Sequence, residues 1–221
     1  MKRFIFVVFL LLPYPGFANE LDRVVHAIEA EWASIYFSAE IRDKENAYTR
    51  LLNKTTEFAK QTHDSPELMF WQATIIASRA EHQNPIEALA AIHKAQDLLI
   101  KTINIKPDTL DGSALITLGS LYYQAPGWPI AFGDDKKAEQ YLKKGLQINP
   151  QGIESNFYYG QYLLNKDQPE EAIEYFKTAL NGPVRQEQEF ADSSLKEKIK
   201  QIIIKTANIE SKSQKKQIAS L

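Results

Sequence analysis

The stretch "KKAEQYLKKGLQ", residues 136–147, recurs in related form as "EEAIEYFKTALN", residues 170–181, at an offset of 34. Ala138 matches Ala172, and aromatic and leucine residues nearby match in the same register. Apolar residues in both copies recur every three or four positions, a spacing that predicts helices with one buried face. The chain is therefore expected to contain a repeated helical unit.

A second match identifies the helix that precedes each copy. The segment "LGSLYY", residues 118–123, corresponds to "YGQYLL", residues 159–164, at an offset of 41. Because the two offsets differ by seven, the first unit has seven extra residues between its helices. Gly119 and Gly160 match, and two helices pack most closely where one of them presents no side chain. We expect both glycines to lie at contacts between helices.

The 34-residue period, with small residues at these positions, resembles the tetratricopeptide repeat. That resemblance implies an all-α fold, a right-handed α-solenoid of helix pairs. The spacing extends toward the N-terminus, because Pro107 follows Ala95 by twelve residues, as Pro150 follows Ala138. Four helix pairs are expected, at residues 20–37, about 51–62, 66–80, 85–107, 111–124, 136–147, 152–165 and 170–181.

A ninth helix is expected after the last pair. Its apolar face carries Leu195, Ile199, Ile202 and Ile203. Ser194 and Glu197 have the spacing of a capping box, so this helix is expected to begin there. A final helix that covers the last repeat is the usual way to close such an array. The repeat domain is assigned to residues 19–209, and the polar tail, 210–221, is expected to be disordered.

The N-terminal segment, residues 1–18, has the features of a secretory signal peptide. Lys2 and Arg3 precede an apolar run, residues 4–12, which is too short to span a bilayer as a helix. Gly16 and Ala18 then form a small-x-small cleavage site. Cleavage after Ala18 is expected to release a periplasmic chain with a net charge of −4 and no further membrane span. A short membrane anchor is the alternative.

A more specific resemblance is concentrated in residues 109–165. The blocks "LDGSA", "PGWP-x-x-FGDD" and "NP-x-G" are similar to those of a group of exported bacterial tetratricopeptide proteins, and the similarity extends over residues 65–205. More remotely, the architecture resembles the T-component proteins of tripartite ATP-independent periplasmic transporters, which are thought to assist ligand delivery. The resemblance implies export and a helical-repeat fold, and it implies no reaction.

Candidate binding residues lie on the helix of each pair that is expected to line a concave groove. Positions three, seven and ten residues after Glu154 share its face of a helix. A groove with aromatic rings, amides and hydroxyls suits a peptide or a small amphiphilic ligand. The alternative is that the aromatic members pack into the core. The candidates are Ile116, Ser120 and Tyr123, whose face includes Ser113, and Glu154, Phe157, Gln161 and Leu164.

The seven extra residues fall within an aromatic loop, "YYQAPGWPIAFGDD", residues 122–135. Its prolines and glycines predict a path rich in turns. The preferred hypothesis is that Trp128 packs onto the helix pair and holds the loop in place, because an exposed tryptophan is costly. The other hypothesis is that Trp128 and Phe132 form an aromatic lid at the edge of the groove. Asp134 or Asp135 is expected to cap the following helix.

Composition and motifs argue against several functional classes. The net charge of −2 gives no basic excess for nucleic acid, and the chain has no cysteine for disulfides or thiolate metal sites. The four histidines are scattered, and Asp134 and Asp135 lack the spacing of a calcium loop, so no metal is expected. Nucleotide-binding and serine-hydrolase motifs are missing from the sequence, so no cofactor is expected.

The expected function is binding without catalysis. The first expectation is a periplasmic scaffold that presents a repeat groove to a protein or peptide partner. The alternative is a small-ligand-binding accessory protein that supports a periplasmic transport system. An enzyme that uses Glu154 near Tyr158 on a carbohydrate is a third hypothesis. A closed groove of several hundred Å³ would favour the small ligand, whereas a long open face would favour a peptide. The sequence does not indicate an oligomeric state.

Overall fold

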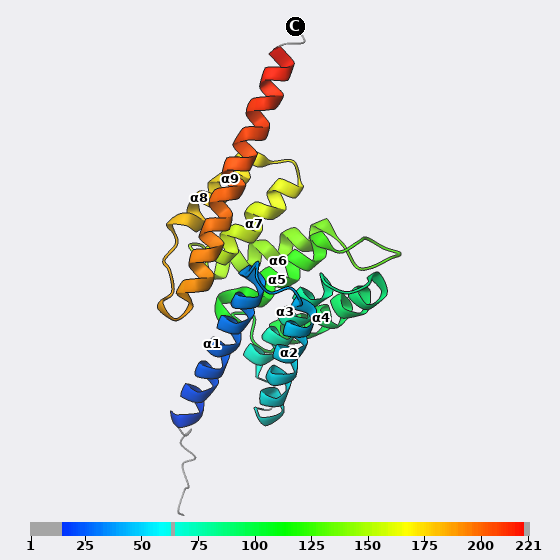
Figure 1. Ribbon diagram of the computed structural model, residues 1–221, viewed down its shortest axis with the longest axis vertical. Helices are drawn as coiled ribbons and strands as arrows, with labels where there is room; N and C mark the ends of the chain where they lie inside the picture. The colour runs from blue at the N-terminus through cyan, green and yellow to red at the C-terminus, as the bar shows by residue number, and fades with distance from the viewer. Residues whose placement is uncertain (1–14, 63–64, 219–221) are drawn as a thin grey trace, which may run out of the picture.

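The computed structural model describes residues 15–62 and 65–218, with side chains described for 20–62 and 65–208. Within these residues the chain is all-α, as predicted, and has no β-strand. Its α-helices, shown in Figure 1, are α1 (Pro15–Phe37), α2 (Lys44–Gln61), α3 (Pro66–Ala80), α4 (Pro85–Ile105), α5 (Ser113–Gln124), α6 (Asp135–Ile148), α7 (Ile153–Asn165), α8 (Pro169–Asn181) and α9 (Glu189–Ile218). Two short 3-10 helices, η1 (Thr109–Gly112) and η2 (Gln186–Gln188), precede α5 and α9.

The starts of several helices follow from local side-chain chemistry. Ser65, Asn84 and Asp134 accept hydrogen bonds from backbone N–H groups in the first turns of α3, α4 and α6. Such caps satisfy amide groups that have no partner inside the helix. Helices α3, α4 and α8 begin with proline, which has no N–H to leave unpaired there. The prediction of an aspartate cap on α6 is confirmed, and the cap is Asp134.

The glycine contacts predicted from the repeat are confirmed. Helix α3 packs on α4, α5 on α6, and α7 on α8. A methyl group at Gly119 would lie 2.7 Å from Cγ of Leu142 on α6, and one at Gly160 would lie 2.6 Å from the ring of Phe176 on α8. Leu142 and Phe176 are themselves related by the offset of 34, so the same contact is made in both pairs.

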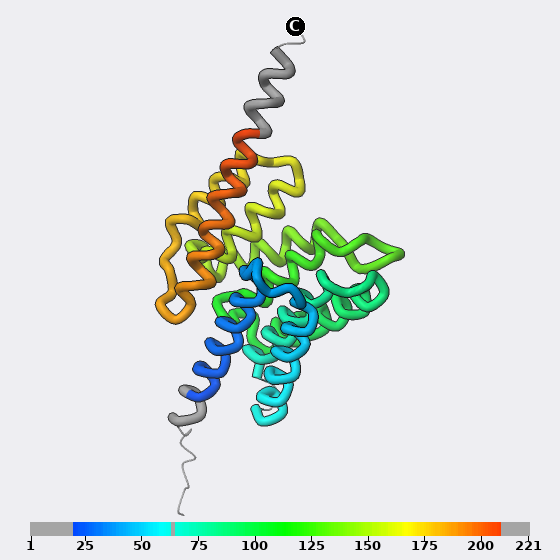
Figure 2. The backbone as a smooth tube through the Cα atoms, viewed as in Figure 1, coloured from blue at the N-terminus to red at the C-terminus, as the bar shows by residue number. Residues whose placement is uncertain are grey.

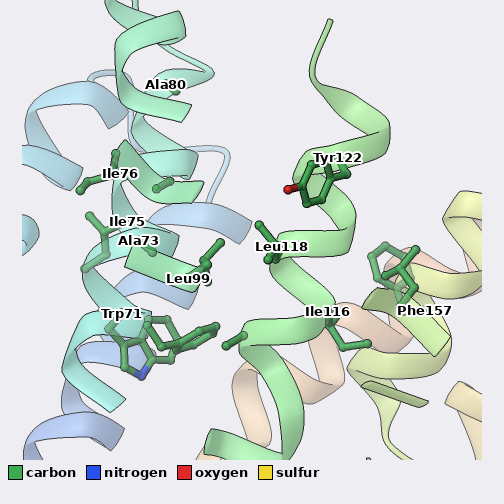
Figure 3. Close-up of a cluster of buried hydrophobic side chains, with 14 of the residues drawn as sticks. Trp71, Ala73, Ile75, Ile76, Ala80, Leu99, Ile116, Leu118, Tyr122 and Phe157 are labelled. Atoms are coloured by element: carbon green, nitrogen blue, oxygen red, sulfur yellow. The ribbon is translucent and has the colours of Figure 1, made fainter. Parts of the chain in front are cut away.

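Buried apolar side chains form a continuous core from α1 to α9. Figure 3 shows its central part, where Leu118 on α5 lies toward Trp71 and Leu99, and Ile116 lies on the side of α5 nearer Phe157. Leu99 and Leu118 have no exposed surface. Helix α5 thus has apolar neighbours on both sides, which explains why its sequence, "SALITLGSLYYQ", has no charged residue.

The two ends of the helical sequence meet. The odd-numbered helices contact one another in order, from α1 to α9, and α1 also contacts α9. Phe37 on α1 packs edge-on against Phe190 on α9, with ring centroids 6.4 Å apart. The Nζ atom of Lys198 on α9 donates a hydrogen bond of 3.0 Å to the hydroxyl of Tyr36. Within the described chain, the odd-numbered helices form a closed set, and Figure 2 shows the blue α1 and orange α9 meeting.

The start of α9 differs from the prediction. The helix begins at Glu189, so Ser194 lies inside it and the predicted capping box is wrong. The cause is the linker: η2 leads directly into α9, and Asp192 in its first turn accepts a hydrogen bond from the backbone N–H of Arg185. The tail expected to be disordered begins within α9, which continues to Ile218.

Two expectations concern chain segments that the structure covers only in part. The predicted signal peptide, residues 1–18, lies outside the described residues up to residue 14, and α1 begins at Pro15. Residues 219–221 of the expected tail also lie outside them. Among the helices of the described segments, none is both long enough and apolar enough to cross a membrane.

Candidate functional site

A pocket of about 210 Å³ lies where three segments of the chain meet. The segments are the start of α5, the α6–α7 connection with the first turn of α7, and the linker after α8. At roughly 30 Å³ per water, the pocket has the volume of about seven water molecules. The lining residues are Leu110, Asp111, Ser113, Ile116, Asn149, Gln151, Gly152, Ile153, Glu154, Ser155, Pro183 and Arg185.

One wall of the pocket has an uncommon backbone path. Leu110, Asp111 and Gly112 have φ angles of 47°, 56° and 83°, so three consecutive residues are left-handed. Glycine adopts this region freely, aspartate tolerates it, and leucine does so only at a cost. Surrounding contacts must hold such a path, and Leu110 packs against the core. The path leads the chain from α4 into α5 and places Ser113 at the pocket.

Glu154, in the first turn of α7, is the half-buried acid of the pocket. Its Oε2 atom accepts a hydrogen bond of 2.8 Å from the hydroxyl of Ser113. Its other carboxylate oxygen receives no hydrogen bond from any residue in the described part of the chain. Loss of contact with water raises the pKa of Glu154, and the charges of Asp192 and Asp111 add to the rise, whereas Ser113 and Arg185 oppose it. Glu154 is therefore a pocket carboxyl with an incomplete set of partners.

A charged network connects this region to α1. Arg185 donates hydrogen bonds from Nη2 and Nε to the carboxylate of Asp192, at 2.6 and 3.1 Å. Glu29 on α1 lies 3.6 Å from Nη2 of Arg185 and accepts a hydrogen bond from Nε2 of Gln188. Burial raises the pKa of Glu29 to about 7, with Arg185 opposing the rise and Glu154 reinforcing it. One arginine thus interacts with Glu29, Glu154 and Asp192, and it links α1 to the segment before α9.

The residues predicted to form a groove do not all reach one surface. Ile116 and Phe157 are core residues, 1% and 3% exposed, although Ile116 also borders the pocket. Ser120 is buried, and its hydroxyl has no hydrogen-bond partner among the described residues. Tyr123, Gln161 and Leu164 are half-buried. The faces of α5 and α7 that were expected to line the groove meet at Ser113 and Glu154, the first residue of each face, where the hydroxyl of Ser113 donates a hydrogen bond to Glu154.

Beyond Glu154, the inner side of α7 carries an aromatic cluster. Burial raises the pKa of Tyr158 well above its ordinary value, and interactions with Tyr36, Glu154 and Tyr123 add to the rise. The Nζ atom of Lys198 lies 5.0 Å from the ring centroid of Tyr36 and 5.5 Å from that of Phe157. This cluster gathers rings from α1, α5 and α7, and Lys198 from α9 is its cation.

The hypothesis that Trp128 holds the loop onto its helix pair is wrong. Trp128 is 89% exposed, whereas Phe132 packs edge-on against Tyr122 and His93, with centroids 5.5 and 5.1 Å away. The N–H of Gly133 donates a hydrogen bond to the carbonyl of Pro126 and closes the loop. In this closed loop Phe132, and not Trp128, is the ring that packs against the helices. The loop projects from the molecule between α5 and α6, as Figure 1 shows.

Four charged residues of this region were missed by reasoning from sequence. Glu29 had a detectable signal, because Val25 and Ala33 lie four residues to either side of it and belong to the same buried face. Asp111 was passed over within the "LDGSA" block, which was used only as a family resemblance. Arg185 and Asp192 gave no local signal, since their importance depends on contact with α1.

Neither a metal site nor a known relative accounts for the pocket. Among the described residues, no group of three or more His, Cys, Asp or Glu is arranged to hold a metal ion. A second pocket, of about 400 Å³, lies between α1 and α2 and is lined by Val24, Lys54 and Phe58 among others.

Comparison with protein-family models finds no match, and comparison with curated proteins finds none either.

Proposed function

We propose that this protein binds a small ligand, without catalysis, in the pocket between α5, α7 and the linker after α8. The observation that supports this most is Glu154, a half-buried carboxyl that lines the pocket and has one oxygen without a donor in the described structure. A ligand that donates a hydrogen bond to this oxygen would complete the partners of Glu154, and a hydrogen bond to a charged group contributes about 1.5–3 kcal/mol. The closed set of odd-numbered helices also favours a small ligand over an extended peptide.

The proposal includes a fold type and a location. We propose a right-handed tetratricopeptide-like solenoid of four helix pairs, with α9 as the cap. The equivalent contacts of Gly119 with Leu142 and of Gly160 with Phe176 support it. The basic and apolar N-terminal segment supports export to the periplasm. In that compartment, a small-ligand-binding protein suits an accessory role in transport.

Native mass spectrometry of the protein purified from its own cells tests the proposal. The parent is expected to carry a bound mass that is lost on denaturation. Gln151→Trp enlarges a side chain of the pocket lining and should remove or weaken that binding. Gln147→Trp, on the exposed surface of α6, is the matched control and should retain it. A bare chain in the parent, or a bound mass that survives Gln151→Trp, would contradict binding in this pocket.

A second candidate function is docking of a protein partner through the α5–α6 loop. The observation that favours it is exposure: Trp128 and Ile130 are 89% and 64% exposed on a loop closed by backbone hydrogen bonds. Buried tryptophan anchors contribute strongly at protein interfaces. A photoreactive residue at position 128 should give a single cross-linked partner in cells, while the same residue at position 147 should not. Equal cross-linking at the two positions would refute this function.

A further inference from the structure

We propose that the pocket selects a ligand that carries a protonated primary amine, held by Glu154 and Asp111. This inference rests on the proposed function of the pocket and names its ligand class. Three charged side chains line the pocket: Asp111, Glu154 and Arg185. The ligand's charge depends on which of these three already has a partner.

The arginine is already engaged. Arg185 gives two side-chain hydrogen bonds to Asp192, whose side chain is only 2% exposed, and its Nη2 also approaches Glu29. These hydrogen bonds use two of the five N–H donors of the guanidinium and compensate its charge with the carboxylate of Asp192. Asp192 and Asp111 both raise the pKa of Glu154 and Arg185 lowers it, so two acids and one cation lie near this carboxyl. The pocket therefore has a surplus of negative charge.

The carboxyl groups are available to a ligand. Glu154 uses one oxygen to accept from Ser113, and the other has no donor among the described residues. Asp111 is exposed at the rim, on the left-handed segment before α5. A cation between them would gain charge-assisted hydrogen bonds, which are about twice as strong as neutral ones. An anionic ligand would be repelled by both.

The rest of the lining favours a primary amine over other cations. Quaternary ammonium groups are recognised by aromatic cages, and none of the described lining residues is aromatic. A primary ammonium has three donors, and the amide oxygens of Asn149 and Gln151 add acceptors to the lining. A calcium ion needs six to eight oxygen ligands, and no group of three or more His, Cys, Asp or Glu is arranged to hold a metal among the described residues. The volume of about 210 Å³ suits a short aliphatic amine.

Calorimetric titration with matched probes tests this inference. The probes are putrescine, the uncharged isostere 1,4-butanediol, the dianion succinate and calcium chloride, each titrated at several pH values from about 7 to 9, because burial raises the pKa of Glu154 and the ion pair needs its ionised form. Putrescine is expected to bind the parent protein, and the other three are not. Glu154→Gln should weaken putrescine binding about ten- to hundredfold, the loss expected for a charge-assisted hydrogen bond. Glu57→Gln, an exposed pair partner of Lys60 on α2, is the matched control.

A second variant protects the test if Glu154→Gln does not fold. Asp111→Asn removes the rim charge, and asparagine also tolerates the left-handed conformation, so the fold should persist while putrescine binds several-fold more weakly. Binding of succinate, butanediol or calcium in place of putrescine, or no binding by putrescine, overturns the amine inference. The Gln151→Trp mass measurement decides the pocket's role separately, so the two failures can be told apart.

Discussion

At the scale of single residues, Glu29 shows burial and charge acting on one carboxyl. Its pKa in the folded protein, about 7, lies above its ordinary value of 4.5, chiefly because burial disfavours the charged form. The stability that this group contributes is therefore fully present below about pH 4.5 and is lost as the pH rises through 7. At 1.36 kcal/mol per pKa unit, a rise from 4.5 to about 7 sets an upper bound of roughly 3–4 kcal/mol on the loss.

Glu29→Gln tests this pH dependence. Glutamine keeps an acceptor for Gln188 but does not ionise, so its free energy of unfolding should fall less between about pH 5 and pH 8 than that of the parent. The pKa of Glu154 is also raised by burial, and Glu154 is unchanged in the variant. Part of the fall in the free energy of unfolding should therefore remain. Urea unfolding at both pH values measures the difference, with Glu40→Gln at an exposed position as the control. An equally steep fall in Glu29→Gln and the parent would contradict the pKa of Glu29.

At the scale of helices, the repeat rests on glycines at close contacts. Gly160→Ala would place Cβ 2.6 Å from the ring of Phe176, closer than nonbonded carbon atoms approach, so the buried ring or the helices must shift. We expect the variant to lose about 1–3 kcal/mol of stability, the usual cost of overpacking. Gly127→Ala is the matched control, because its Cβ would meet nothing closer than 3.8 Å. Equal thermal unfolding of the two variants would refute the glycine contact.

Much of the helical architecture could be predicted from the sequence, because its signals are local and repeated. Apolar spacing marked the helices, and the second match, at an offset of 41, located Gly119 and Gly160 at their contacts. The loop was harder, since either Trp128 or Phe132 could have been the buried ring. Backbone hydrogen bonds across the loop decided for Phe132, and composition does not encode such bonds. The left-handed path at residues 110–112 was also missed, because composition does not encode this backbone conformation.

At the scale of the whole molecule, the candidate site depends on contacts between distant segments. Glu154 was selected from its helix face, and Ser113 from the equivalent face of the preceding unit, so that pair was accessible to repeat reasoning. Arg185 and Glu29 lie near opposite ends of the chain, and no local pattern relates them. Their contact follows from the meeting of α1 and α9, which an open array would lack. The sequence therefore indicated Ser113, Ile116 and Glu154 among the lining residues, but not the charges of Asp111 and Arg185 beside them.

The meeting of α1 and α9 predicts how a disturbance at one end of the chain spreads. In an open repeat array each unit contacts only its neighbours, so loosening α9 would affect α7 and α8 and would leave α1 unchanged. Here α9 contacts α1 as well. Ile199→Val removes one methyl from a fully buried residue of α9, at a cost of about 1 kcal/mol, and should keep the fold.

Hydrogen exchange without denaturant, where local opening dominates, measures the spread. Amides of α1 should exchange faster in Ile199→Val than in the parent, along with those of α7 and α8. Amides of α4, which packs on α3 and α5, should be unchanged. Ile86→Val, at a side chain that is 83% exposed, is the matched control and should alter neither end. If the exchange of the α1 amides, like that of the α4 amides, is the same in Ile199→Val as in the parent, the two ends of the chain are energetically independent. Glu29 is then not part of the same cooperative unit as the pocket.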